Sequence, residues 1–362
     1  MSIEGAILTY RYGTDFHDGN HCLESYASVL KVDEAEVQFM AQGGGTVDPF
    51  SESYDIIEHL RMAKLRERTT PSDVLGDVAK SLRFQFLSHY CGMTPKWRVK
   101  LRGMHGKRTL PDFACVGALK SGTSDLSTYL FQHPSMLPPL SKEIHTTRVA
   151  DWLPHYPTVA EKNAVVDRTG QALSGYFNPW MHKVDLIRNF HAANPDAKII
   201  VMLRNPTDRA YSHYKWDFLV GGKAARHRPE YASYAEYIDF CLKLFPATPA
   251  PSLCGFPLLQ SGIYVTSLAL WMDTFGRENV HVVLSEDFFR DTNATICGIH
   301  EFLGLAPEAP APHPIVNQNP VSTPPQDESA RRRLHQFYRP WNERLSSLLD
   351  RDLGWDSHES VR

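Results

Sequence analysis

The chain lacks the cysteine patterns that mark zinc-binding and disulfide-rich proteins. Its six cysteines are spread over 362 residues and form no C-x-x-C pair, so neither a zinc site nor a disulfide framework is indicated. Most are predicted to be reduced thiols in the core. Cys241 and Cys254, which flank a proline-rich loop, are the only pair suited to a local bridge.

Long apolar runs and an excess of charge are also absent. No run approaches the roughly eighteen apolar residues of a membrane-spanning helix, and the first thirty residues contain several charges and no apolar core of a signal peptide. We therefore expect no membrane segment and a cytoplasmic location. The net charge of −3 gives no general attraction for polyanions, so nucleic acid is not an expected partner and any anion site must be local.

The most informative stretch is DFACVGALKSGTSDLSTY, residues 112–129. Phe113 to Val116 predict a buried strand, Gly117 and Gly122 allow a tight turn, and apolar residues at helical spacing follow until Pro134. Backbone amides of such a turn, together with a helix N-terminus, bind anions. This pattern predicts a phosphate cradle, although an ordinary strand-turn-helix junction is also consistent with it.

The cradle differs from the nucleotide-triphosphatase P-loop, G-x-x-x-x-G-K-[ST]. Thr123 stands where that loop has its lysine, and Lys120 lies two residues before Gly122. Thr123 and Ser124 are then available to donate hydroxyl hydrogen bonds, an arrangement poorly suited to a γ-phosphate beside Mg²⁺.

Two further clusters follow predicted strands. Ser141-Lys142-Glu143-Ile144-His145 comes after a probable strand at 135–140, and Arg204 ends the apolar strand 198–203, KIIVML. Ligands of α/β proteins bind at the carboxyl edge of the sheet. Ser212 lies on the helix that begins at Pro206, so Arg204 and Ser212 are candidates to hold a second phosphate. We interpret residues 141–145 as part of a ligand site at this edge, and a surface turn is the alternative.

Strand-helix units repeat along the chain, with connections too long for hairpins. They predict an α/β fold of the P-loop type, with three layers and a mainly parallel central sheet flanked by helices. Residues 1–108 are predicted to form a mostly helical extension of unknown role, and 109–362 the catalytic domain. The basic run between Lys96 and Arg108 is typical of a solvated face. Further predicted elements are helices at 51–68, from 71 to 86, at 263–275, 288–303 and 328–349, a strand at 280–284, and a long loop at 307–325.

Taken together, the motifs of this chain resemble those of a known family. GALKSGTSDLSTYL, SKEIH, KIIVMLRNPTDRAYSHY, SGIYVTSLALWMDTFGRENVHVVLSEDF and FYRPWNERLSSLL, in this order, are similar to sulfotransferases that use 3′-phosphoadenosine 5′-phosphosulfate, particularly the carbohydrate and Golgi-type branch with its heparan and chondroitin enzymes. The likeness covers about residues 110–352. It implies a cofactor with two separated phosphates, which is released as adenosine 3′,5′-bisphosphate.

The resemblance implies a role for each site residue. The cradle would hold the 5′-phosphosulfate, Arg204 and Ser212 the 3′-phosphate, and Tyr264 would lie on the nucleotide side. Glu143 would be the general base, with His145 as its rival because an imidazole titrates near neutrality. Lys120 would neutralise the leaving oxygen, and Lys142 would assist. No metal is required. The cradle residues concerned are Lys120, Ser121, Gly122, Thr123 and Ser124.

One feature departs from many glycosaminoglycan enzymes, which have a lysine-glycine loop late in the chain. No lysine follows Lys243, so Asn317, Ser322 or Arg331 would have to replace it. The acceptor stays open between a carbohydrate and a small molecule with a hydroxyl or amine. Two other functions remain alternatives: a P-loop nucleotide kinase or NTPase, and a non-catalytic nucleotide-binding protein.

Overall fold

The computed structural model describes residues 96–355, apart from 145, 222–228, 246–257 and 314–324. The helices predicted at 51–68 and 71–86 lie outside this part of the chain. The described residues belong to two compact units. One comprises 96–204 and 271–313, and the other 205–270 and 325–355 with the gaps just named.

The first unit is built on a five-stranded sheet in the order β2-β3-β1-β4-β5, in which every neighbouring pair is parallel. This confirms the predicted parallel sheet flanked by helices. The strands are short apolar segments, and the three central ones, β1, β3 and β4, are buried on both faces. Their bounds are β1 Phe113–Cys115, β2 Met136–Leu137, β3 Leu173–Phe177, β4 Lys198–Leu203 and β5 Val280–Leu284.

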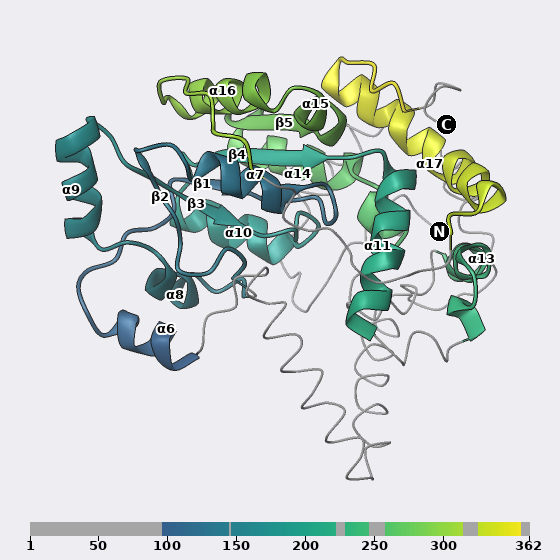
Figure 1. Ribbon diagram of the computed structural model, residues 1–362, viewed down its shortest axis with the longest axis horizontal. Helices are drawn as coiled ribbons and strands as arrows, with labels where there is room; N and C mark the ends of the chain where they lie inside the picture. The colour runs from purple at the N-terminus through teal and green to yellow at the C-terminus, as the bar shows by residue number, and fades with distance from the viewer. Residues whose placement is uncertain (1–95, 145, 222–228, 246–257, 314–324, 356–362) are drawn as a thin grey trace, which may run out of the picture. The chain divides into compact units, whose positions relative to one another are not determined.

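Helices cover both faces of this sheet, as Figure 1 shows for α16 (Thr292–Leu303) and α10 (Val184–Ala193) on opposite sides of the strands. On one face, Phe113 and Phe177 pack with apolar residues of α7 and α16. On the other face, Tyr176 packs against Trp152 and Phe190. Consecutive residues of β3 therefore point to opposite faces, as a strand requires.

Two helices of the first unit, α9 and α16, begin at side chains that cap them. Thr158 and Glu161 form a reciprocal capping box at the start of α9. Asp291 accepts from the amide of Ala294 and divides the predicted helix 288–303 into two. The bounds are α6 Lys96–Gly103, α7 Thr123–Leu130, α8 Val149–Trp152, η2 Leu153–His155, α9 Val159–Thr169, α10 Val184–Ala193, η5 Arg277–Asn279, α15 Ser285–Arg290 and α16 Thr292–Leu303.

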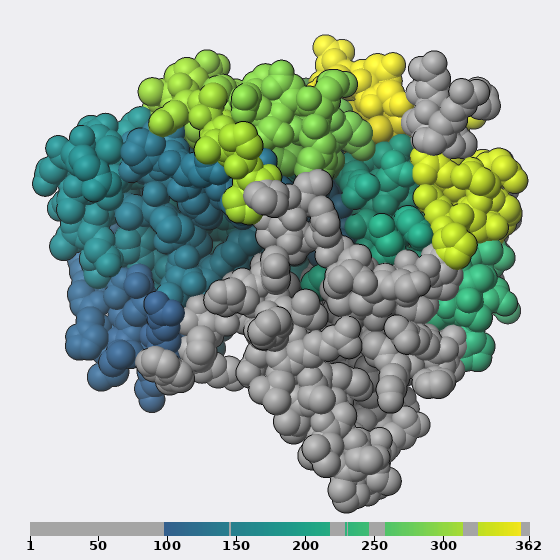
Figure 2. Space-filling model, viewed as in Figure 1, coloured from purple at the N-terminus to yellow at the C-terminus, as the bar shows by residue number. Residues whose placement is uncertain are grey.

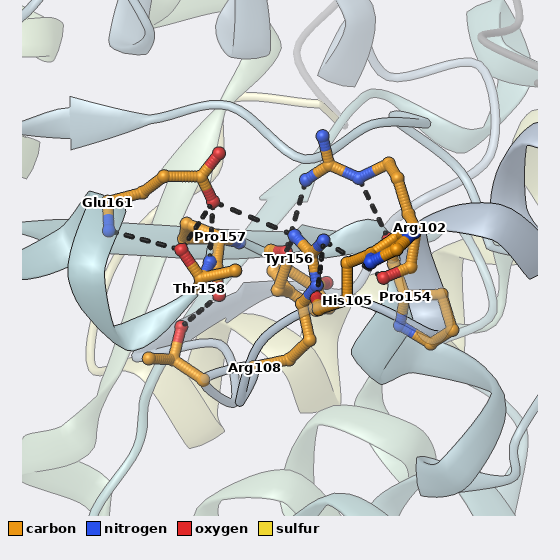
Figure 3. Close-up of polar contacts among 9 residues, drawn as sticks. Arg102, His105, Arg108, Pro154, Tyr156, Pro157, Thr158 and Glu161 are labelled. Atoms are coloured by element: carbon orange, nitrogen blue, oxygen red, sulfur yellow. Dashed lines mark hydrogen bonds and ion pairs between the residues drawn. The ribbon is translucent and has the colours of Figure 1, made fainter.

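Two arginines of the basic run between Lys96 and Arg108 bind the backbone of neighbouring segments. Arg102 and Arg108 donate to backbone carbonyls of η2 and its neighbours, as Figure 3 shows. Arg108 also lies 3.6 Å from a carboxylate oxygen of Glu161, and its side chain is 9% exposed. The prediction of a solvated face holds for Arg98, Lys100 and Lys107 and is wrong for these two arginines, because their guanidinium groups satisfy carbonyls that end helical turns. Helix α6 lies at the surface (dark blue in Figure 2). The boundary at residue 108 stays a prediction.

The second unit is helical and has a core of tyrosines. Tyr214, Tyr231 and Tyr237 stack on one another, and both Tyr231 and Tyr237 donate to the buried carboxylate of Asp217. Cys241 is a free, buried thiol whose pKa is raised by burial; Cys254 lies outside the described residues. The elements are α11 Pro206–Gly221, η3 Pro229–Tyr231, α13 Tyr234–Leu244, η4 Gln260–Gly262, α14 Val265–Phe275, which continues into the first unit, and α17 Glu328–Leu349.

No helix in the described part of the chain has both the length and the apolar character needed to cross a membrane.

Candidate active site

The carboxyl ends of the parallel strands gather the predicted residues of the first unit at one edge of the sheet. The cradle follows β1, and Arg204 follows β4 directly. Lys142 and Glu143 follow β2, and Glu143 forms a parallel backbone bridge with Phe177 at the end of β3. Segments far apart in the sequence therefore meet at the edge where α/β proteins bind ligands.

The backbone of the cradle needs its glycines. Gly122 has φ +96°, and a Cβ there would lie 3.0 Å from Phe289 Cζ and 3.1 Å from Met202 Cε. Any other residue at this position would have a strained backbone, and its side chain would press against these two neighbours. Lys120 also has a positive φ, 67°, which costs a residue other than glycine roughly 1–2 kcal/mol. Backbone strain of this kind is concentrated at functional sites.

Two side chains from neighbouring strands hold the cradle. Ser285, the first residue after β5, has its hydroxyl 2.6 Å from the carbonyl oxygen of Ser121 and 2.8 Å from that of Leu203. Arg204 Nη1 donates to the carbonyl oxygen of Lys120 at 3.4 Å. The sequence reasoning missed Ser285, although its position directly after an apolar strand was a signal that it lies at this edge.

The cradle contains a buried donor that has no partner among the described residues. The side chain of Ser121 is enclosed, with the residue 1% exposed, and its Oγ makes no hydrogen bond within the described residues. Buried hydroxyls without a partner are uncommon and require an explanation. Helix α7 begins at Thr123, and its N-cap residue, Gly122, has no side chain to cap the first-turn amides. Both features suit an anion in the cradle.

Lys142 connects the cradle to the candidate base. Its Nζ lies 3.0 Å from Ser124 Oγ, 3.4 Å from Thr123 Oγ1 and 2.9 Å from Glu143 Oε1. The side chains of Lys142 and Glu143 are 14% and 18% exposed, so this ion pair is partly shielded from water. The structure thus brings Lys142, Glu143, Thr123 and Ser124 together.

A second polar side chain, also missed from the sequence, fixes the loop that carries Glu143. Asn178 is 2% exposed, and its Nδ2 donates to the carbonyl oxygen of Ile144 at 2.9 Å. It follows the short strand β3, which the sequence reasoning did not identify. Nearby, burial raises the pKa of the Cys115 thiol to about 12, although Lys142 opposes this. Cys115 is therefore a protonated core residue and not a nucleophile.

The contacts described above do not include the other predicted residues. His145 lies outside the described residues, as do Asn317 and Ser322. Ser212 is half-buried on α11 of the second unit, so its pairing with Arg204 stays a prediction. Tyr264 is 1% exposed and packs edge-on against Trp355. Arg331 pairs with Asp208 at 2.7 Å, which occupies its guanidinium in the second unit.

The described residues contain no group of three or more histidines, cysteines or acids able to hold a metal ion. The geometry defines a class of site: a phosphate cradle after a central parallel strand, with a lysine and a carboxylate beside it.

Comparison with known proteins identifies the family. The family model of the sulfotransferase domain matches residues 110–319, which is more than half of the chain. This chain therefore belongs to the sulfotransferase domain family. The resemblance seen in the sequence is confirmed, and the match includes the cradle, Glu143 and Arg204.

Several individual proteins are similar to it. Carbohydrate sulfotransferase 15 of Rattus norvegicus is 27% identical over 314 residues, which cover 69% of this chain and 56% of that protein. Heparan sulfate glucosamine 3-O-sulfotransferase 6 of Homo sapiens is 25% identical over 277 residues, covering 69% and 75%. A sulfotransferase crystal structure from Alicyclobacillus acidocaldarius has a TM-score of 0.48 and 27% identity, covering 69% of this chain and 100% of that one. The chain spans little more than half the length of the first relative.

Proposed function

We propose that this chain transfers a sulfuryl group from 3′-phosphoadenosine 5′-phosphosulfate to a hydroxyl or amine of a carbohydrate or small-molecule acceptor, with Glu143 as the general base. One observation carries the proposal: the Lys142 ammonium contacts both the cradle hydroxyl of Ser124 and the carboxylate of Glu143. A carboxylate suited to accept a proton thus lies directly beside a turn suited to bind a phosphate. One relative is named carbohydrate sulfotransferase 15 and another heparan sulfate glucosamine 3-O-sulfotransferase 6. Both names support a carbohydrate acceptor.

The cradle residues suit the phosphosulfate end of this donor. The hydroxyl of Ser121, which has no partner in the part of the chain that the structure describes, is a donor ready for an anionic oxygen. A Cβ at Gly122 would press against Phe289 and Met202, and the positive φ also favours glycine, so this turn of the cradle needs a glycine there. Lys120, Thr123 and Ser124 would add one ammonium and two hydroxyls. Arg204, Ser212 and Tyr264 would bind the 3′-phosphate and nucleoside, and no metal is needed for this binding.

The reaction is an in-line displacement at sulfur. The acceptor oxygen or nitrogen forms a bond to sulfur while the bond from sulfur to the bridging phosphate oxygen breaks, and adenosine 3′,5′-bisphosphate leaves. Glu143 takes the acceptor's proton as the new bond forms. Lys120 and Lys142 offset the negative charge that develops on the bridging oxygen. Since Lys142 already contacts Glu143, it also favours the ionised form of the base.

The decisive experiment incubates the purified chain with the phosphosulfate donor and libraries of oligosaccharides and hydroxylated or amino-bearing small molecules. Mass spectrometry should reveal an acceptor that gains one SO₃ together with an equal amount of adenosine 3′,5′-bisphosphate. The reaction should proceed in the presence of a metal chelator. Mg²⁺-dependent hydrolysis or transfer from ATP, without sulfation, would favour the nucleotide kinase or NTPase. Tight binding of the bisphosphate without transfer to any acceptor would favour the non-catalytic alternative.

A further inference from the structure

Helix α11 buries three ionisable residues on one face. Arg209, His213 and Asp217 follow one another at intervals of four residues, and all three side chains are fully enclosed. Residues four apart in an α-helix share a face. Burial of polar and charged groups costs free energy unless each of them finds a partner. The partners of these residues therefore show what holds this helix.

Arg209 binds two groups at once. Its Nη1 lies 3.1 Å from His213 Nδ1, and its Nη2 donates to the carbonyl oxygen of Leu258. Because a guanidinium can only donate, His213 Nδ1 accepts, as a neutral imidazole does. Leu258 lies two residues before η4. Arg209 thus joins α11 to the segment that leads into η4.

Tyr338 of α17 fixes the segment to which Arg209 is anchored. Its hydroxyl donates to the carbonyl oxygen of Leu259 at 3.0 Å. Its ring lies against Gly262, where a Cβ would be only 2.7 Å from the Tyr338 hydroxyl oxygen. Burial raises the pKa of Tyr338 to about 12, with Arg209 opposing the shift, so the hydroxyl keeps its proton and can donate. The acceptor of Arg209 is therefore itself held from a second helix.

The same face of α11 is fixed at a second point. The carboxylate of Asp217 accepts from the hydroxyls of Tyr231 in η3 and Tyr237 in α13, at 3.0 and 3.2 Å. Arg209 and Asp217 are about two turns apart along the helix. A rotation of α11 about its axis would break the contacts at both points, so this network sets the rotation of the helix.

Ser212 depends on that rotation. It immediately precedes His213 and is half-buried on α11. Adjacent residues of an α-helix point about 100° apart, so a helix turned about its axis would turn the Ser212 hydroxyl with it. A hydrogen bond weakens steeply when its distance or angle departs from the preferred range. Under the proposed function, Ser212 would donate such a bond to the 3′-phosphate of the donor.

We propose that Arg209 is a positioning residue for recognition of the 3′-phosphate: it fixes the rotation of α11 and thereby aims Ser212, while Tyr338 holds the acceptor of Arg209 in place. The proposal rests on the proposed function and makes it more specific. Arg209 and Tyr338 are fully buried and act through Ser212, without touching the donor. Selectivity for a nucleotide with a 3′-phosphate then depends on a buried network as well as on the groups that contact the phosphate.

The test compares two nucleotides that differ only in the 3′-phosphate, adenosine 3′,5′-bisphosphate and adenosine 5′-monophosphate. Competition titrations against a fluorescent analogue of the bisphosphate give the affinity of the whole chain for both, including weak binding. We expect the wild type to bind the bisphosphate about thirtyfold or more tightly, because charged hydrogen bonds to the 3′-phosphate are added. A merely structural role of Arg209 would weaken both nucleotides alike and leave this ratio unchanged.

Two variants perturb the network and one serves as a control. Arg209→Lys keeps the charge but loses the planar fork that reaches two acceptors at once, so the ratio should fall about tenfold. Tyr338→Phe removes only a hydroxyl, and the ratio should fall about threefold to tenfold. Tyr234→Phe is the matched control, because Tyr234 lies in the same buried core and its hydroxyl has no partner within the described residues. It should keep the wild-type ratio.

A combined variant tests whether Arg209 acts through Ser212. Ser212→Ala should lower the ratio by itself, since the hydroxyl that contacts the phosphate is lost. Adding Arg209→Lys to Ser212→Ala should lower it no further, because residues that act as one unit are not additive. A second, independent fall in the combined variant would mean that Arg209 affects the phosphate by another route and would contradict the proposal.

Two further results would overturn this role of Arg209. These are an unchanged ratio in both Arg209→Lys and Tyr338→Phe, and an equal loss of affinity for the two nucleotides. If Arg209→Lys does not fold, Tyr338→Phe alone decides. Equal binding of both nucleotides by the wild type would refute the 3′-phosphate site itself. Failure of the proposed reaction gives a different result: selective binding that depends on Arg209, without transfer of SO₃ to any acceptor, would refute only the reaction.

Discussion

Lys142 and Glu143, adjacent in the sequence, form an ion pair of 2.9 Å at the carboxyl edge of the sheet. Neighbouring residues of an extended chain usually point in opposite directions. Here both side chains are mostly enclosed, and the ammonium also reaches a cradle hydroxyl. A charge pair shielded from water interacts more strongly than one on the surface. The pair therefore links the candidate anion site to the proposed proton acceptor.

Replacing Glu143 by glutamine should abolish proton removal and leave donor binding intact. The amide keeps the shape of the side chain but cannot accept the acceptor's proton, so transfer should fall by about 10²- to 10⁴-fold. Product formation by mass spectrometry and nucleotide affinity by calorimetry separate the two effects. Glu301→Gln, an exposed acid on α16, is the control and should be fully active. Full transfer by Glu143→Gln would make His145 the base.

Replacing Lys142 by methionine should slow transfer by about 10- to 100-fold, since one cation near the leaving oxygen is lost. The acid limb of the pH–rate profile should also move to higher pH, because the ionised carboxylate of Glu143 loses the ammonium at 2.9 Å. Rates measured across a pH series test both effects. An equal loss at every pH would mean that Lys142 acts on the leaving group alone.

Lys120→Ala and Arg204→Ala should each weaken binding of adenosine 3′,5′-bisphosphate by about tenfold or more, because charged hydrogen bonds to phosphate are lost. Calorimetric titration measures the effect. Arg168→Ala, which removes an exposed arginine of α9, should leave the affinity unchanged. Unchanged affinity in both site variants would refute the idea that these residues hold the two phosphates.

His300 should make the protein less stable in acid. Burial, with a contribution from His133, lowers the pKa of His300 from 6.5 to about 4. Its Nδ1 accepts from the amide of Glu308, which requires the neutral ring. The unfolded chain therefore takes up a proton first: the stabilisation is complete above pH 6.5 and is lost as the pH falls towards 4. The loss should be on the order of 1–3 kcal/mol.

His300→Asn tests this, because the asparagine oxygen can accept from the same amide but does not titrate. Melting temperatures between pH 7 and 4 should fall less steeply in the variant than in the wild type, whatever the difference at pH 7. Parallel curves would show that His300 does not control the acid response.

Local patterns predicted several elements with close bounds. The β-branched run KIIVML became β4 over the predicted residues 198–203, and the final helix has its predicted bounds, 328–349. Other elements were predicted less well. β3, LSGYF, was missed because its glycine and serine weaken the strand signal. The strand predicted at 135–140 is only two residues long, and Asp291 divides one predicted helix into two.

The sequence by itself determined the cradle, since its glycines, lysine and hydroxyls act through the conformation of one short turn, and the order of its motifs determined the family. Only the tertiary structure decided which distant groups support that turn. Ser285 and Asn178 reach the site because β5 and β3 lie in one parallel sheet with β1 and β4, so that their carboxyl ends share an edge. Strand adjacency arises from packing between segments far apart in the chain, which no local pattern encodes.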